Sequence, residues 1–141
     1  MSAASNYLEN KVLDHVLGEG ARNFTSPATL YLALFNNTSG NALANLEAGT
    51  LTDEISTSGT AYSRQAVDFA AAASGTAATN GTVTWTTATA SWGTVTHVAV
   101  MDGGTVGSGN VLFYGALTAS KAIDTGDTFQ ISSSNLTVSL A

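Results

Sequence analysis

The chain has 141 residues and no cysteine, and only 10% of its residues are charged, with a formal net charge of −6. This length is typical of one domain, and the absence of cysteine excludes disulfides and thiolate metal sites. The four cations, Lys11, Arg22, Arg64 and Lys121, are scattered and no apolar run approaches the ~20 residues that cross a bilayer, so neither nucleic acid nor a membrane is an expected partner.

The first predicted element is an amphipathic α-helix from Asn6 to Leu17, within an N-terminal segment 1–20 of the same domain. Ser5 or Asn6 is suited to cap its start, and Gly18 and Gly20 supply left-handed positions that end it. The apolar residues recur at helical spacing and are Leu8, Val12, Leu13, Val16 and Leu17.

The apolar stripe of this helix needs a surface to pack against, because an isolated helix of this length is only marginally stable. Two interpretations remain open. The helix covers the β core of its own chain, or it docks on a partner subunit. For the second interpretation, Leu8, Val12 and Val16 are the candidate interface residues.

The segment from Thr29 to Phe35 is the first predicted strand, and apolar residues on both of its faces indicate a position inside the sheet. A long, weakly patterned loop follows over residues 36–60, with a short helix expected across Ala42 to Ala48. Long loops in compact domains are usually functional or disordered. This loop is therefore the first candidate for a variable contact surface.

Charged residues in and after this loop are further candidates for an interface. They are Glu47, Asp53, Glu54 and Arg64. Arg64 lies in the middle of a strand predicted over residues 61–69, where it has two open interpretations. It makes a structural ion pair or hydrogen bonds to loop carbonyls, or it anchors an interface, where arginine is enriched.

The most strongly apolar part of the sequence runs from Ala90 to Leu117, where two apolar segments flank a glycine-rich reversal. This pattern predicts a β-hairpin that is buried on both faces. Before it, residues 70–81 read as a loop of small residues. Residues 82–87 are then predicted as an alternating strand with Val83 and Trp85 directed inwards.

After the hairpin, residues 118–123 are predicted as an edge strand or a linker, and residues 128–132 and 135–140 as the last strands. Together these elements predict a mainly β fold, namely a two-layer antiparallel β-sandwich with Greek-key or jelly-roll-like connections and one N-terminal α-helix. The sandwich is assigned to residues 21–141, with the long loop 36–60 as an excursion.

No combination of residues in the sequence indicates a catalytic, cofactor or metal site. His15 and His97 are the two histidines, short of the three or four convergent ligands that zinc needs. Asp124 and Asp127 flank Gly126 without the register of a calcium loop, so they indicate a turn. Nothing places the acidic residues of the long loop in a sugar cleft, as a glycosidase needs.

Four aromatic residues have two interpretations, namely Tyr31, Trp85, Trp92 and Tyr114. In one they stack against a sugar ring, and in the other they fill the core of a small sandwich, which is the commoner arrangement.

Five short stretches occur together in this chain: Tyr7–Lys11 with Leu13–His15, Ala28–Phe35, Tyr62–Gln65, Ala90–His97 and Leu112–Leu117. In this order, and over most of the chain, they resemble a family of small phage and prophage proteins described as tail-fibre-like virion proteins. The resemblance implies a virion protein without catalytic residues. A Thr-rich β domain with few charges agrees with repetitive assembly on a particle.

We therefore expect a non-enzymatic structural protein of a bacteriophage virion, of tail-fibre or baseplate type, which is assembled in the host cytoplasm. Its expected partners are other virion proteins and further copies of itself, for instance in a trimer. Two alternatives stay open. One is a capsid decoration protein that binds the major capsid protein, and the other is a carbohydrate-binding module for host attachment.

Overall fold

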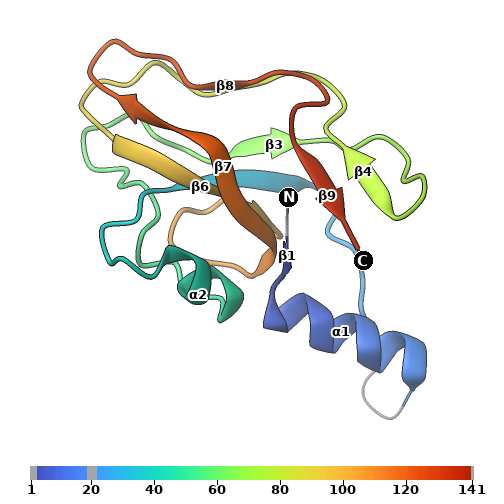
Figure 1. Cartoon of the computed structure of the whole chain (residues 1–141). Coiled ribbons are helices and arrows are strands. Elements are labelled where there is room, and N and C mark those ends of the chain that lie inside the picture. The colour runs from blue at the N-terminus through green and yellow to red at the C-terminus, as the bar shows by residue number, and fades with distance from the viewer. Residues whose placement is uncertain (1–2, 19–21, 141) are drawn as a thin grey trace.

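The structure, a computed structural model, describes residues 3–18 and 22–140 (Figure 1). It confirms a mainly β fold, built on a five-stranded antiparallel sheet with a helix at the N-terminal end of the chain. In chain order the elements are β1 (Ala3–Ala4), α1 (Asn6–Leu17), β2 (Leu30–Phe35), α2 (Ala42–Glu47), β3 (Gln65–Val67), β4 (Thr76–Ala78), β5 (Val83–Thr84), β6 (Gly93–Met101), β7 (Val111–Ile123), β8 (Gln130–Ile131) and β9 (Thr137–Ser139).

The β6–β7 hairpin forms the centre of the sheet, whose strand order is β1-β7-β6-β2-β3. This hairpin is the predicted one: β6 and β7 pair antiparallel, with Ala99 opposite Tyr114. On its other side, β6 pairs with β2, where Leu32 lies opposite Val100. The central strands are apolar on both faces because both faces of the sheet are covered.

Two hydrophobic clusters cover the two faces, as the alternation within β2 predicts: Leu32 and Leu34 lie in one, Ala33 and Phe35 in the other. The first cluster extends to the ribbons β5–β8 and β4–β9 through Val83, Trp85, Phe129, Ile131 and Val138. The second is covered by Leu46 of α2, the short helix expected in the long loop. Figure 1 shows β8 above the sheet and α2 below it.

Some strands differ from the prediction because their partners are far away in the sequence. The segment 70–81, predicted as a loop, contains β4, which exists because Thr76–Ala78 pairs with Thr137–Ser139. Residues 118–123 are the end of β7, of which residues 121–123 pair with the start of β6. The strand predicted over 61–69 is shorter, since only Gln65–Val67 pairs with β2.

β7 becomes irregular beyond the middle of the sheet. His97 pairs with Ala116 but Val95 pairs with Lys121, so residues 117–120 lie opposite one residue of β6. Such a bulge bends a strand and interrupts its ladder of hydrogen bonds. On its outer edge, β7 pairs with the two residues of β1.

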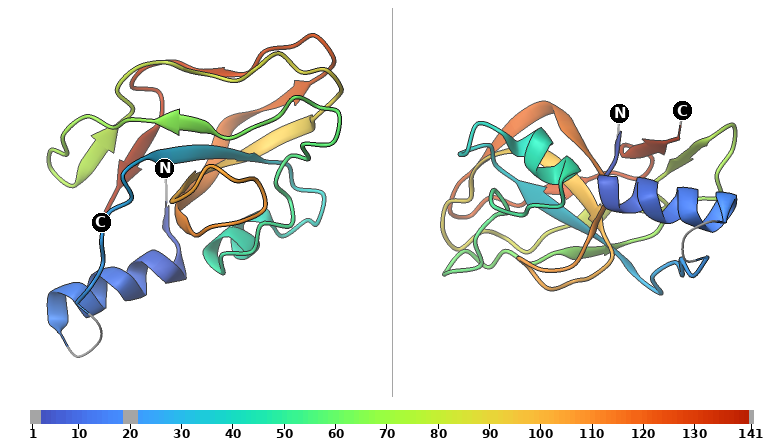
Figure 2. Two further views of the ribbon diagram at one scale, coloured as in Figure 1. Left: turned by 180° about the vertical axis from the view of Figure 1, so that it is seen from behind. Right: turned by 90° about the horizontal axis from the view of Figure 1, so that it is seen from below.

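The helix α1 has the predicted bounds and the predicted ends. The hydroxyl of Ser5 accepts the N–H of Leu8, and Gly18 closes the helix in the left-handed conformation, with φ of 90°. Gly20 lies outside the described residues. The turned views show α1 extending away from the sheets, and it contacts β1 and β7 (Figure 2).

Candidate functional site

The base of α1 is fixed to the edge of the sheet by Ser5, which is completely buried. Its backbone N–H donates to the carbonyl of Leu112 at 2.9 Å, and its hydroxyl donates to the carbonyl of Val111. The side chain of Leu8, one turn later, is buried in the first hydrophobic cluster. The first turn of α1 therefore belongs to the core, as the first interpretation of the helix predicts.

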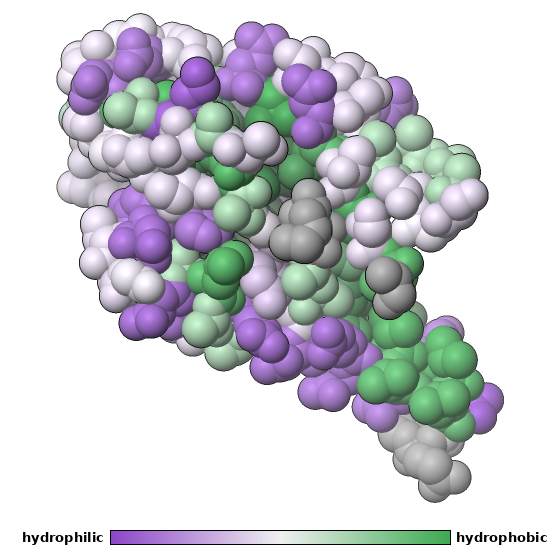
Figure 3. Space-filling model, viewed as in Figure 1, coloured by the Kyte–Doolittle hydropathy of each residue, from purple (hydrophilic) through white to green (hydrophobic). Residues whose placement is uncertain are grey.

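The rest of the apolar stripe on α1 is exposed. Leu13 is 53% exposed, Val16 67% and Leu17 70%, while Val12 lies at the margin with 36%. Figure 3 shows an apolar patch over the far end of α1. Of the three predicted contact residues on the helix, Leu8 is thus in the core, whereas Val12 and Val16 are open to a partner. We call Val12, Leu13, Val16 and Leu17 the helix stripe.

An apolar groove of about 280 Å³ lies between the ribbon β4–β9 and the sheet. Its lining has almost no polar surface, and none of the described lining residues comes from α1. Leu140, which is 62% exposed, lies in its wall. The lining residues are Leu30, Phe69, Ala72, Gly75, Ala77, Val100, Leu112, Phe113, Val138 and Leu140. We call this feature the apolar groove.

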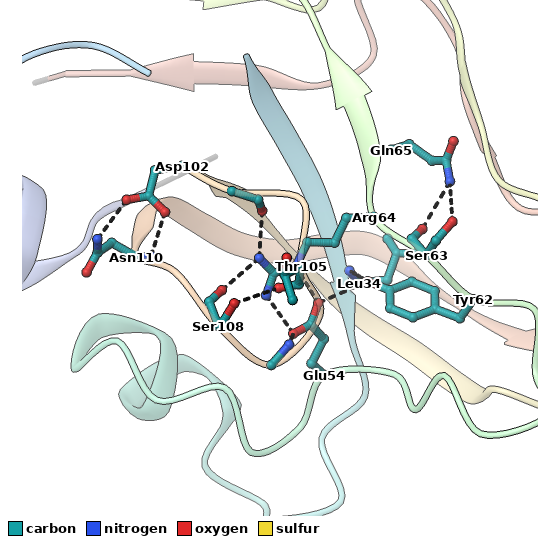
Figure 4. A network of polar contacts seen from close by, with 12 residues as sticks. Leu34, Glu54, Tyr62, Ser63, Arg64, Gln65, Asp102, Thr105, Ser108 and Asn110 are labelled. Carbon is teal, nitrogen blue, oxygen red and sulfur yellow. Dashed lines mark hydrogen bonds and ion pairs between the residues drawn. The ribbon is translucent and has the colours of Figure 1, made fainter. Parts of the chain in front are cut away.

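The ion pair between Arg64 and Glu54 joins the long loop to the sheet (Figure 4). It is bidentate, with Nε 2.7 Å from Oε1 and Nη2 2.8 Å from Oε2, and the two side chains are 0% and 2% exposed. Nη1 of Arg64 also donates to the carbonyls of Gly103 and Ser108, at 2.7 and 2.9 Å. Both structural contacts predicted for Arg64 are therefore present, and its guanidinium is used within the chain.

Glu54 connects this ion pair to further groups. Its Oε2 accepts the backbone N–H of Gly107 at 2.8 Å. The hydroxyl of Tyr62 lies 3.4 Å from Oε1 and accepts the N–H of Leu34 at 2.8 Å. Burial and the charge of Glu54 raise the pKa of the Tyr62 phenol, which stays neutral. One carboxylate thus ties together the long loop, β2 and the loop between β6 and β7.

The loop between β6 and β7, residues 102–110, is fixed at several points. Both oxygens of Asp102 accept hydrogen bonds from Asn110, one from its backbone N–H and one from its side-chain amide, each at 2.7 Å. Gly104 lies against the ring of Tyr31, where a Cβ atom would come within 2.8 Å of the ring. Together with Arg64, these contacts give the loop one shape without any regular secondary structure.

The remaining acidic candidates of the long loop lie apart from this network. Asp53 is 3% exposed and accepts the N–H of Ser39 at 3.0 Å and the hydroxyl of Thr38 at 3.2 Å. Burial raises its pKa, but the hydrogen bonds from Ser39 and Thr38 outweigh burial, and the net pKa is lowered. Glu47 is exposed at the end of α2. The structure therefore brings Glu54 and Arg64 together, and leaves Glu47 free to meet a partner.

The two tryptophans fill the core, which corrects the interpretation that they stack on a sugar, whereas Tyr31 is partly buried. Trp85 and Trp92 are 1% and 4% exposed. Trp92 packs edge-on against Tyr62 with ring centroids 5.4 Å apart, and its indole N–H donates to the carbonyl of Thr60 at 2.9 Å. No face of either indole ring is left for a sugar, because hydrophobic neighbours surround both.

Other predicted features also have a local structural role. Asp124 and Asp127 close a turn, in which the N–H of Asp124 donates to the Asp127 carboxylate at 2.9 Å. His97 lies in β6 beside Thr96, and burial lowers its pKa. Within residues 3–18 and 22–140, no group of three or more potential ligands is arranged to hold a metal ion. Over the same residues, no helix has both the length and the apolar character needed to span a bilayer.

Sequence reasoning missed two features of these sites. Ser5 was recognisable as a helix cap, but its bonds to β7 join residues more than a hundred positions apart and leave no local signal. The apolar groove was missed as well, because β4 consists of Thr and Ala and its strand character depends on β9.

A comparison with protein families matches most of the chain. The family model described as "Podophage GP4 fiber I protein gp80" covers residues 3–139 of the chain. No curated protein matches the chain. The match extends from β1, through both helices, to the end of β9, so it includes the helix stripe and the network around Arg64.

Proposed function

The chain belongs to the family described as Podophage GP4 fiber I protein gp80, and from this premise we propose that it is a non-enzymatic structural protein of a phage tail fibre or baseplate. Membership of this family makes it a phage fibre protein and a virion component. The proposal adds that it is incorporated into the particle in the host cytoplasm through α1, and that its partners are virion proteins.

The observation that carries the proposal is the helix stripe. Three of its side chains are more than half exposed, although they sit on one helix face beside each other. Covering each of them is worth roughly 1–2 kcal/mol, and contiguous apolar patches of this kind mark contact sites. The base of the helix is fixed to the core, so the stripe is held in one position before a partner arrives.

The body of the domain supports the same role. The buried ion pair and the fixed loop 102–110 give a rigid domain with few charges, as a repeated unit of a particle requires. The alternative of a capsid decoration protein uses the same stripe and differs only in the partner. The alternative of carbohydrate binding is weakened, because Trp85 and Trp92 are in the core and cannot stack on a sugar.

The test uses the whole phage or prophage particle. Particles are produced in cells that supply either the wild-type chain or a variant with Val16→Glu and Leu17→Glu. A matched control carries Leu43→Glu, which changes an aliphatic residue of α2 that is 48% exposed. Purified particles are then probed by immunoblot, and gold-labelled antibody locates the protein by electron microscopy.

We expect the stripe variant to be depleted from particles at least tenfold, the control to be retained, and the gold label to lie on the tail. Retention of the stripe variant at the wild-type level would contradict the role of α1. Label on the head would replace the tail-fibre assignment with the capsid decoration alternative.

A further inference from the structure

We propose that Asn80 is a site of spontaneous deamidation, at which the backbone nitrogen of Gly81 attacks the side-chain carbonyl of Asn80. The sequence contains one Asn-Gly pair, and these two residues form it. They lie in the turn between β4 and β5, away from the helix stripe. The inference therefore stands independently of the proposed function.

The side chain of Asn80 is free to react. Both Asn80 and Gly81 are exposed and lie outside the helices and strands. Within residues 3–18 and 22–140, no hydrogen bond holds the carboxamide of Asn80. Other asparagine side chains are held: those of Asn36 and Asn37 accept hydrogen bonds, and that of Asn110 donates to Asp102. A held carboxamide cannot turn towards the next backbone nitrogen.

The attacking nitrogen is accessible as well. Gly81 has a φ of 105°, and no atom of the described residues lies within 4 Å of the place where a Cβ would be. Its N–H donates to the hydroxyl of Ser133 at 3.1 Å, in an exposed contact outside any strand ladder. Exposed hydrogen bonds of this kind open at low cost in free energy. The nitrogen of Gly81 is therefore shielded by one contact that opens readily.

The reaction needs water and no other reagent. The nitrogen of Gly81 loses its proton and forms a bond to Cγ of Asn80, while the bond from Cγ to the side-chain nitrogen breaks and ammonia leaves. The product is a five-membered succinimide. Water then adds to one of its two carbonyl carbons and opens the ring, which gives aspartate or isoaspartate. Asparagine and water are thus converted to an acidic residue and ammonia.

Asn135 provides a comparison within the same chain. It is also exposed and lies in a turn, where its backbone N–H donates to the carbonyl of Ser132 at 3.1 Å. The residue after it is Leu136, whose side chain crowds the backbone nitrogen that would have to attack. Two asparagines in similar surroundings therefore differ mainly in the residue that follows, and Asn80 should react faster.

Conversion of Asn80 places a negative charge opposite another carboxylate. Phe69 and Thr79 form an antiparallel bridge, and the backbone N–H of Asn80 donates to the carbonyl of Asp68 at 2.8 Å. Asp68 and Asn80 are therefore cross-strand neighbours. Like charges directly opposite each other destabilise a strand pair. Isoaspartate also lengthens the backbone by one carbon, so the modification weakens the attachment of the β4–β9 ribbon.

The first experiment follows the reaction in the purified chain. The protein is incubated at mildly alkaline pH, where backbone amides lose their protons more readily, and is then cleaved with trypsin and sequenced by tandem mass spectrometry. Cleavage in heavy-oxygen water marks any conversion that occurs during the digest. We expect Asn80 to exchange its side-chain NH₂ for OH at least tenfold faster than Asn135, with both aspartate and isoaspartate formed. Equal rates at the two positions would overturn the inference.

Two variants test the assigned nucleophile. Ser133→Ala removes the acceptor that holds the Gly81 N–H, and it should speed the conversion of Asn80. Gly81→Ala adds a Cβ beside the attacking nitrogen and should slow the conversion severalfold. Circular dichroism checks that Gly81→Ala folds, because its φ is positive, and Ser133→Ala carries the test if it does not. A rate of conversion that the folded variants leave unchanged would contradict attack by Gly81.

The second experiment measures the consequence for stability. Asn80→Asp reproduces one product, and its urea unfolding midpoint should lie below that of the wild type. Adding Asp68→Asn to this variant removes the facing charge and should restore the midpoint. The matched control Asn135→Asp adds the same charge elsewhere and should leave the midpoint unchanged. A wild-type midpoint for Asn80→Asp would show that the modification does not weaken the strand pairing, and would refute this consequence.

Discussion

The two helices, α1 and α2, show an inverse relation between sequence pattern and burial. α1 has twelve residues and a clear apolar stripe, yet its one buried residue is Leu8. α2 has six residues and little pattern, yet Ala42 and Leu46 are both buried against the sheet. Helical periodicity therefore indicates that an apolar helix face packs against another apolar surface, and it does not show that the same chain provides that surface.

The difference follows from what holds each helix. α2 lies in the long loop, which is tied to the sheet by the buried pair of Glu54 and Arg64 and by the turn around Asp53. Among the residues that the structure describes, the buried attachment of α1 comes from Ser5 and the first turn of the helix. The helix stripe is therefore available to a partner, whereas α2 is part of the core.

The largest effect that we expect comes from breaking the ion pair that ties the loop carrying α2 to the sheet. Arg64→Ala leaves the Glu54 carboxylate buried without its partner, which should reduce the free energy of unfolding by about 3–5 kcal/mol. Urea unfolding followed by tryptophan fluorescence measures the loss. The double variant Arg64→Met with Glu54→Gln should lose less, because no unpaired charge remains. If the single variant loses less than about 1 kcal/mol of its free energy of unfolding, the ion pair does not stabilise the fold.

The next effect compares the helices directly. Leu46→Ala removes a side chain that is 1% exposed, and the resulting cavity should lower the free energy of unfolding by about 2–4 kcal/mol. Leu17→Ala removes a side chain that is 70% exposed, and it should change the free energy of unfolding by no more than about 0.5 kcal/mol. Urea unfolding of both variants checks the contrast, and equal losses would mean that α1 packs on its own chain in solution.

A smaller effect concerns the base of α1. Ser5→Ala removes the helix cap and the bond to Val111, which should cost about 1–2 kcal/mol. Hydrogen exchange should become faster in α1 while α2 keeps its protection. Ser5→Thr, which retains the hydroxyl, is the matched variant. Faster exchange in both helices would indicate that α1 is not an independent unit.

The smallest expected effect is a pH dependence of the stability contributed by Asp53 in the loop that carries α2. The folded-state pKa of Asp53 lies below its ordinary value of 3.8, so its ionised form stabilises the fold. That contribution is fully present above the unfolded-state pKa and is lost as the pH falls through the folded-state pKa. Urea midpoints measured from about pH 6 to about pH 3 should fall more steeply in the wild type than in Asp53→Asn, and parallel curves would contradict the assignment.

The sequence supports a reliable prediction wherever a local pattern determines the structure. The bounds of α1, the two faces of β2 and the β6–β7 hairpin all follow from periodicity and glycine placement. β1 and β4 could not be predicted in this way, because Ala3–Ala4 and Thr76–Ala78 have no strand pattern of their own and become strands through distant partners.

The candidate site was predictable in its parts and not in its arrangement. The sequence indicates that Arg64 meets a carboxylate or loop carbonyls, and the structure shows both at once. Which acidic residue pairs with it depends on the path of the long loop, which brings Glu54 and not Glu47 to the guanidinium. The two interpretations of α1 each describe one half of the helix, since burial changes between Leu8 and Val16.

The bulge in β7 has a consequence for how the edge of the sheet meets other protein chains. Regular strands at a sheet margin act as templates on which further chains polymerise through their backbones. Residues 117–120 interrupt that row of amide groups, and the exposed Lys121 adds a repelling charge beyond them. The irregular end of β7 therefore offers another chain little regular backbone to pair with, which disfavours uncontrolled strand-to-strand polymerisation.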